Sequence, residues 1–140
     1  MNEVKPKIVL TVGVYDLLHW GHFELFRRAK ELAGNDGKLI VAIQDDNVVK
    51  KYKPQARLVY NWATRAKMIR ALRYVDDVVP YGDVDEAVKH IEFDVFAVGG
   101  DQTHSGFQRA MEWCRENGKS VVTLERTRGI SSTQLRGQCR

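Results

Sequence analysis

The chain has 140 residues, of which 44% are hydrophobic and 29% charged, and it carries a formal net charge of +4 at pH 7. A chain of this length buries roughly two thirds of its unfolded surface, so we expect one globular domain over residues 1–140, and the composition excludes disordered, collagen-like and fibrous proteins. No stretch approaches the roughly eighteen apolar residues of a membrane-spanning helix, and basic residues alternate with acidic ones instead of forming the stripe typical of nucleic-acid binding.

The opening MNEVKPK lacks the apolar region of a secretory signal peptide. The two cysteines, Cys114 and Cys139, do not have CxxC spacing, so neither a disulfide framework nor a zinc site is indicated. We therefore expect a cytoplasmic protein with no membrane and no nucleic-acid partner.

Five short apolar runs rich in β-branched residues predict buried strands. They are Ile8–Val12, Leu39–Ile43, Val75–Val79, Val95–Val98 and Val121–Leu124. The segments between them show apolar residues at helical spacing. Strands that alternate with helices pair in parallel through right-handed crossovers. We therefore predict an α/β fold: a single Rossmann-like open parallel sheet of about five strands with helices on both faces.

Ligands of such sheets bind beyond the carboxyl ends of the strands, so functional residues are expected just after each apolar run. The first run is followed by the sequence HWGH at residues 19–22, with a helix expected to begin near Phe23. The glycine-rich fingerprints of dinucleotide-binding and P-loop proteins are both missing. Imidazoles three residues apart lie on the same side of a helix start and can donate to an anion, which the free N–H groups of the helix also favour. Gly21 leaves room for a ligand to approach the backbone.

Two other interpretations of His19 and His22 stay open at this point. One ring could cap the helix while the other packs against Trp20. The pair could also bind a metal, although zinc needs a third protein ligand and neither a nearby cysteine nor an HExxH pattern supplies one.

The segment from Asp45 to Val59 is expected to be one long irregular loop, and long loops in compact domains are often functional lids. Lysine runs are often only solvated, but an anionic ligand would find positive charge in and after this segment. The residues concerned are Lys50, Lys51, Lys53, Arg65 and Arg73.

The last strand leads into ERTRGISSTQLRG. Arg126 and Arg128 precede a glycine, and Ser131, Ser132 and Thr133 open a short expected helix. Hydroxyls at such positions either cap the helix or share its N–H groups with a phosphate. Two helix starts expected at the same edge of one sheet favour a polyphosphate ligand.

The stretch GVYDLLHWGHFELFRRAK resembles the HxGH nucleotidyltransferases. With RALRYVDDVV and RTRGISST, it makes the chain most similar to the glycerol-3-phosphate cytidylyltransferases, from about Ile8 to Leu135. The resemblance implies that glycerol 3-phosphate or a related polyol phosphate attacks the α-phosphorus of CTP and receives CMP, with release of pyrophosphate. It also implies Mg²⁺ carried on the triphosphate, a homodimer, and a product used for the cell envelope or a capsule.

By this resemblance, His19 and His22 stabilise the α-phosphate, and Lys53 and Arg126 are further catalytic residues. The implied nucleotide site comprises Val14, Tyr15, His19, Gly21, His22, Lys53, Arg73, Asp101, Arg126, Thr127, Gly129, Ile130, Ser131, Ser132 and Thr133. Asp16 and Lys51 are implied to contact the acceptor, and no protein ligand for the metal is implied. Asp101 is alternatively a cap of the following loop.

Two features depart from the glycerol-phosphate enzymes. Val14 stands where threonine is usual, and GGDQTHSGFQ is similar in its GGD to the heptose-phosphate nucleotidyltransferases. An alternative is therefore transfer from ATP or another triphosphate to a heptose or other sugar phosphate. A second alternative, from a different class, is a non-catalytic nucleotide sensor. His104, in the same stretch, either lines the acceptor pocket or is a bystander.

Overall fold

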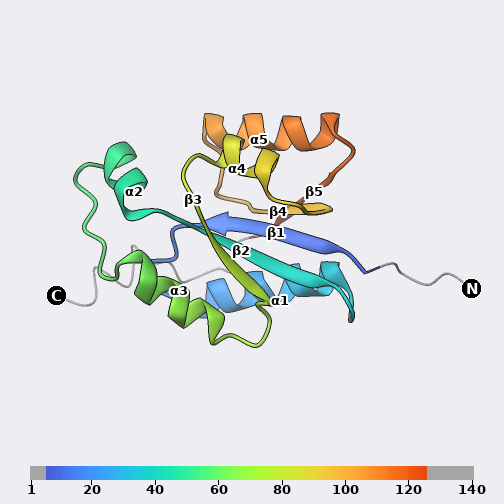
Figure 1. The fold of residues 1–140 in the computed structure, drawn as a ribbon, viewed down its shortest axis with the longest axis horizontal. Helices are drawn as coiled ribbons and strands as arrows, with labels where there is room; N and C mark the ends of the chain where they lie inside the picture. The colour runs from blue at the N-terminus through green and yellow to red at the C-terminus, as the bar shows by residue number, and fades with distance from the viewer. Residues whose placement is uncertain (1–5, 126–140) are drawn as a thin grey trace, which may run out of the picture.

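A computed structural model describes residues 6–125 and shows one open sheet of five parallel strands (Figure 1). The strands lie in the order β3-β2-β1-β4-β5, and helices connect them. Along the chain the elements are β1 Ile8–Gly13, α1 Trp20–Ala33, β2 Lys38–Gln44, α2 Asp46–Tyr52, α3 Trp62–Arg70, β3 Asp77–Tyr81, α4 Val84–His90, β4 Val95–Gly99, α5 Ser105–Glu116 and β5 Ser120–Leu124. The predicted Rossmann-like α/β fold is confirmed.

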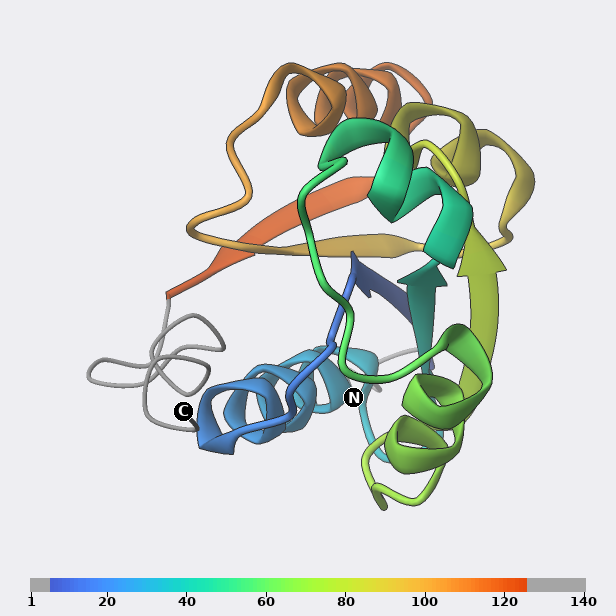
Figure 2. The same ribbon diagram turned by 90° about the vertical axis from the view of Figure 1, so that its left-hand side faces the viewer.

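Helices cover the sheet on both faces, as Figure 2 shows, with α1 and α3 on one face and α4 and α5 on the other. Val9 of β1 packs into the cluster on the α1 and α3 face, whereas its neighbour Leu10 packs into the cluster on the α4 and α5 face. Cys114 is fully buried in the second cluster. Because both faces are covered, the central strands are largely apolar, with Thr11 as a buried polar residue in β1, which is why their sequences do not alternate.

The strand order reverses between β1 and β4, whose carboxyl ends lie at the edge of the sheet that faces the viewer in Figure 2. Gln102 joins these two ends: its Nε2 donates to the Val12 carbonyl and its Oε1 accepts from the Gly99 N–H, both at 2.9 Å. A crevice that can hold a ligand is expected at such a reversal. The fold thus places the candidate site after β1 and β4.

The third strand begins two residues later than predicted, at Asp77 instead of Val75. Asp76 explains the shift, because its N–H donates to the Leu39 carbonyl and its carboxylate accepts from Lys30 Nζ at 2.6 Å before the ladder begins. Val75 still packs against the core from the preceding turn. Pro80 is tolerated because β3 is an edge strand.

The prediction of one irregular loop from Asp45 to Val59 is wrong, because residues 46–52 form α2. Asp45 caps this helix by accepting from the Asn47 N–H at 2.8 Å, and Val49 is its buried residue. A helix that buries so little leaves almost no apolar periodicity in the sequence. In the part of the chain that the structure describes, no helix is both long and apolar enough to cross a bilayer.

Candidate active site

The turn after β1 places the ring of Tyr15 behind the histidine pair. Tyr15 has a φ of 54°, a left-handed backbone conformation that is uncommon outside glycine, and its ring meets those of His22 and Phe26 edge-on at centroid distances of 5.3 and 5.2 Å. A β-carbon at Gly13 would lie 2.6 Å from Tyr15 Cζ, so this fold of the turn requires glycine there. Tyr15 is buried, which raises the pKa of its phenol, and it therefore supports His22 from the core side.

Helix α1 begins at Trp20, three residues before the predicted start near Phe23, because His19 caps it. His19 Nδ1 accepts from the Gly21 N–H at 3.0 Å, and His22 Nδ1 accepts from the His19 N–H at 3.3 Å. Both imidazoles therefore cap the helix, in a reciprocal arrangement like a capping box. Trp20 is 61% exposed and contacts Phe23, so neither histidine depends on it.

The caps fix the tautomer of each neutral ring. Since Nδ1 of His19 and of His22 accepts a hydrogen bond, the neutral rings carry their protons on Nε2. The rings stack with centroids 3.9 Å apart and planes at 25°. Burial, with the neighbouring His19 as a second cause, lowers the pKa of His22 to about 3. At neutral pH, His22 is thus an uncharged donor whose Nε2–H is set in position by the backbone.

The depressed pKa of His22 predicts an acid-sensitive fold. Between the folded pKa of about 3 and an unfolded value of about 6.5, the unfolded chain binds a proton that the folded chain does not. The free energy of unfolding should therefore be unaffected by His22 above pH 6.5 and fall as the pH is lowered through this window, by up to about 1.4 kcal/mol per pH unit. Urea unfolding of the wild type and of His22→Gln at pH 7, 6 and 5 measures this slope.

The matched control is His90→Gln, because His90 is an exposed residue at the end of α4. It should keep the wild-type slope, whereas His22→Gln should flatten it. Parallel slopes for the wild type and His22→Gln would mean that His22 titrates normally in the folded protein.

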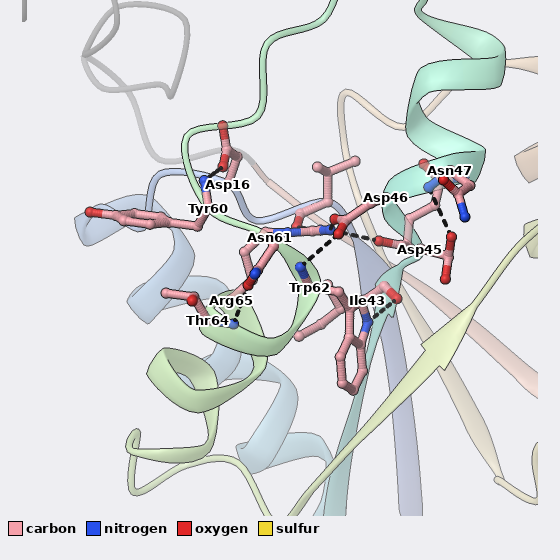
Figure 3. Close-up of polar contacts among 12 residues, drawn as sticks. Asp16, Ile43, Asp45, Asp46, Asn47, Tyr60, Asn61, Trp62, Thr64 and Arg65 are labelled. Atoms are coloured by element: carbon pink, nitrogen blue, oxygen red, sulfur yellow. Dashed lines mark hydrogen bonds and ion pairs between the residues drawn. The ribbon is translucent and has the colours of Figure 1, made fainter.

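Arg65 holds the carboxyl ends of β1 and β2 together, as Figure 3 shows. The sequence suggested that Arg65 offers positive charge to a ligand, but its side chain is fully buried and forms an ion pair within the protein. Nη1 donates to the Val14 carbonyl at 2.7 Å, and Nη2 donates to the Gln44 carbonyl at 3.0 Å and forms an ion pair with Asp46. The suggestion that Arg65 supplies positive charge to an anionic ligand is wrong; Arg65 positions the turn that carries Val14.

Asp16 fastens the segment between α2 and α3 to the turn after β1. Asp16 is only 3% exposed, and its carboxylate accepts from the N–H groups of Val59 and Tyr60, both at 2.9 Å. Figure 3 shows the contact with Tyr60. Trp62, the first residue of α3, attaches the end of the same segment to β2, because its Nε1 donates to the Ile43 carbonyl at 2.9 Å. The structure therefore places Asp16 under this segment, and its predicted contact with the acceptor stays a prediction.

A cavity of about 520 Å³ opens beside the turn after β1 and extends between α2, α4 and α5. Three of the predicted site residues line it, namely Val14, Lys53 and Asp101. Lys53 is the C-cap residue of α2, the helix that follows β2, and Asp101 lies just after β4. Segments that follow different strands therefore line the same cavity. The N-cap of α5 is His104, and the alternative role of Asp101 as a cap of the loop after β4 stays a prediction.

The remaining predicted residues are placed as follows. Lys51 is exposed on α2, with its ammonium 5.4 Å from the centroid of the Tyr52 ring. Arg73 is exposed just before β3, at the amino ends of the strands, and the structure does not bring it to the histidine pair. Arg126, Thr127 and residues 129–133 lie outside the described residues. The chain reaches them from the carboxyl end of β5, where Arg28 of α1 donates to the Glu125 carbonyl at 3.1 Å.

Sequence reasoning missed Gln102 and gave Arg65 the wrong role, whereas it did name His104 as a candidate lining residue, and His104 lines the cavity. Arg65 and Gln102 act on backbone carbonyls far away in the chain, which leaves no local signal. His104 did carry a signal, because His104-Ser105-Gly106 repeats the His-x-Gly order of residues 19–21 at the helix after the neighbouring strand. Among the described residues, no group of three or more His, Cys, Asp or Glu side chains is arranged to hold a metal ion.

Comparison with known proteins gives consistent matches. A family model described as cytidylyltransferase-like matches residues 10–138. The glycerol-3-phosphate cytidylyltransferase of Staphylococcus aureus is 38% identical over 135 residues, which cover 93% of this chain and 92% of that protein. The enzyme of the same name from Bacillus subtilis is 35% identical over 133 residues, covering 93% and 95%. An FAD synthase of Korarchaeum cryptofilum is 33% identical over 129 residues, covering 91% and 80%.

Proposed function

The chain belongs to the cytidylyltransferase-like family and is a nucleotidyltransferase, and from this premise we propose that it transfers CMP from CTP to glycerol 3-phosphate or a related polyol phosphate. The proposal includes magnesium bound to the triphosphate substrate, a homodimeric assembly and a cytoplasmic location. The product, an activated polyol, would suit the synthesis of an envelope or capsule polymer.

One observation carries the chemistry: two stacked imidazoles whose Nδ1 atoms are occupied by backbone N–H groups, at the carboxyl edge of the sheet. Such rings are donors fixed before the substrate arrives. Donors that need no reorganisation stabilise charge as it develops in a transition state, which is the main demand of phosphoryl-type transfer.

The reaction needs no general base from the protein. The second pKa of a phosphate monoester is near 6, so the acceptor phosphate is largely dianionic at neutral pH. One of its oxygens attacks the α-phosphorus, a new P–O bond forms, and the bond from the α-phosphorus to the bridging oxygen breaks. Pyrophosphate leaves with that electron pair, and no proton has to move.

We assign the residues to this reaction as follows. The Nε2–H groups of His19 and His22 donate to the non-bridging oxygens of the α-phosphate. Lys53, on the cavity wall, neutralises phosphate charge. Arg126 and the hydroxyls of residues 131–133 hold the β- and γ-phosphates, which is supported by the parallel direction of β5 and by the contact between Arg28 and Glu125.

The direct test is an incubation of the protein with magnesium, CTP and glycerol 3-phosphate, with pyrophosphate release as the readout. We expect release that depends on both substrates. No release with any member of a panel of polyol phosphates would reject the proposal.

The second candidate is the same transfer from ATP or another triphosphate to a heptose or other sugar phosphate, which Gly99-Gly100-Asp101 favours. Thermal unfolding in the presence of each of the four triphosphates separates the two, because a ligand that binds only the folded state raises Tm. We expect the largest rise with CTP. A rise with ATP and none with CTP would favour the second candidate.

A further inference from the structure

Helix α2 buries little of its surface, so polar contacts decide where it lies. Val49 is its only buried residue, and in Figure 1 the helix stands beyond the carboxyl end of β2. A segment with so few apolar contacts opens at a low free energy unless other bonds hold it. Lys53, the C-cap residue of α2, lines the cavity together with Val14 and Asp101, the other two lining residues that we expect to bind the nucleotide. The bonds that hold α2 therefore also place Lys53.

The first turn of α2 is anchored on two sides. The Asp46 carboxylate forms an ion pair with Arg65 and accepts from the Trp62 N–H at 3.1 Å. On the other side, the N–H of Asp45 donates to the Tyr81 carbonyl at the end of β3, at 2.9 Å. These contacts fix the beginning of the helix and leave its last turn to be held by other means.

The last turn of α2 is joined to α4 by a hydrogen bond from the Tyr52 hydroxyl to the Asp83 carboxylate. Both residues line the cavity. The bond raises the pKa of Tyr52, so the phenol remains a donor at neutral pH. Asp83 is the N-cap residue of α4, yet its side chain makes no cap hydrogen bond. An aspartate at this position usually accepts from the N–H groups of its own helix, whereas this one accepts from a different helix.

Helix α4 is a firm support for this bond. Its Val84 and Val88 are buried in the cluster on the α4 and α5 face of the sheet. Arg109 of α5 adds a polar link, because its Nε donates to Asp85 Oδ2 at 2.9 Å. The contact between Tyr52 and Asp83 thus ties a sparsely packed helix to a well-packed one.

We propose that Tyr52 is a positioning residue of this enzyme: by donating to Asp83 it holds the last turn of α2 against α4, and it thereby holds Lys53 at the phosphates of the nucleotide. The inference rests on the proposed function, which assigns Lys53 to those phosphates. Tyr52 acts through Lys53 and needs no contact of its own with the substrate.

The first test needs no substrate. The Lys53 N–H donates to the Val49 carbonyl at 2.8 Å, so its hydrogen–deuterium exchange reports opening of the last turn of α2. In Tyr52→Phe this exchange should be about three- to tenfold faster than in the wild type, the scale of one ordinary hydrogen bond. Tyr74→Phe is the matched control, because Tyr74 packs against the core just before β3, at the amino ends of the strands. It should keep the wild-type rate, and equal rates in the wild type and Tyr52→Phe overturn the inference.

The second test connects the bond to Lys53. Tyr52→Phe should raise KM for CTP about three- to tenfold with little change in kcat, because the triphosphate is charged before the transition state as well as in it. Lys53→Met should raise KM at least as much, and adding Tyr52→Phe to Lys53→Met should then change nothing further. A merely structural role of Tyr52 would instead lower kcat through loss of folded protein and would add to the effect of Lys53→Met.

Substitutions of Asp83 test the other partner of the bond. Asp83→Asn keeps an oxygen that can accept from Tyr52 and should keep KM for CTP within about twofold of the wild type. Asp83→Ala removes the acceptor and should behave like Tyr52→Phe. Equal KM values in these two Asp83 variants would overturn the inference.

The outcomes separate this inference from the proposed function. Turnover with an unchanged KM for CTP in Tyr52→Phe overturns the inference and leaves cytidylyl transfer standing. If no acceptor supports turnover, the proposed function fails, and calorimetric titration with CTP then gives Kd for the same variants in place of KM. The inference is overturned if Tyr52→Phe binds CTP as tightly as the wild type, if its effect adds to that of Lys53→Met, or if the wild type binds no CTP.

Discussion

Replacing His19 or His22 with alanine is expected to lower kcat by about 10²–10³-fold, the scale observed when one preorganised transition-state donor is removed. Because the lost hydrogen bond forms fully only as charge develops on the α-phosphate, kcat and kcat/KM should fall together while KM for CTP changes little. Steady-state kinetics of pyrophosphate release measures both parameters.

The two rings act as one unit, so their effects should not add. Each ring caps the same helix start, and they stack at 3.9 Å. The double variant should therefore be little slower than either single variant. Loss of a cap also costs about 1 kcal/mol of stability, so Tm must be followed in parallel.

His90→Ala is again the matched control and should keep full activity. A non-catalytic sensor predicts a different result: the histidine variants would change the affinity for the nucleotide, and neither they nor the wild type would turn over. Full activity in both histidine variants would contradict the roles assigned to these rings.

The parts of the fold that the sequence predicted are those with local causes. A strand buried on both faces is apolar along most of its length, so Ile8–Val12 and Val95–Val98 were recognisable, and their observed bounds differ by one residue. The HWGH turn was recognisable for a similar reason, because residues that cap one helix start lie next to each other in sequence.

The parts that could not be predicted depend on partners far away in the chain. The carbonyl of Val14 lies 51 positions from Arg65, whose charge suggested a ligand contact until its burial was known. Asp16 and the Tyr60 N–H are 44 positions apart. The left-handed backbone of Tyr15 was not predicted either; its ring packs against His22 and Phe26, which follow it by seven and eleven positions.

Replacing Arg65 with methionine is expected to destabilise the protein by about 3 kcal/mol, the lower end of the range for breaking a buried ion pair, because Asp46 is partly open to water. Methionine preserves much of the apolar contact but leaves the carbonyls of Val14 and Gln44 without this donor. Urea unfolding at pH 7 measures the loss.

Two further variants locate the cause of that loss. Arg70→Met, on the exposed face of the same helix, should change the free energy of unfolding by less than about 0.5 kcal/mol. In the Arg65→Met variant the Asp46 carboxylate has lost its ion-pair partner. Adding Asp46→Asn removes that unpaired charge and should recover part of the free energy of unfolding, and a double-mutant cycle measures the coupling energy between the two residues. A loss below about 1 kcal/mol in Arg65→Met would mean that the turn carrying Val14 holds its position without the guanidinium, and that the site is positioned from the histidine caps alone.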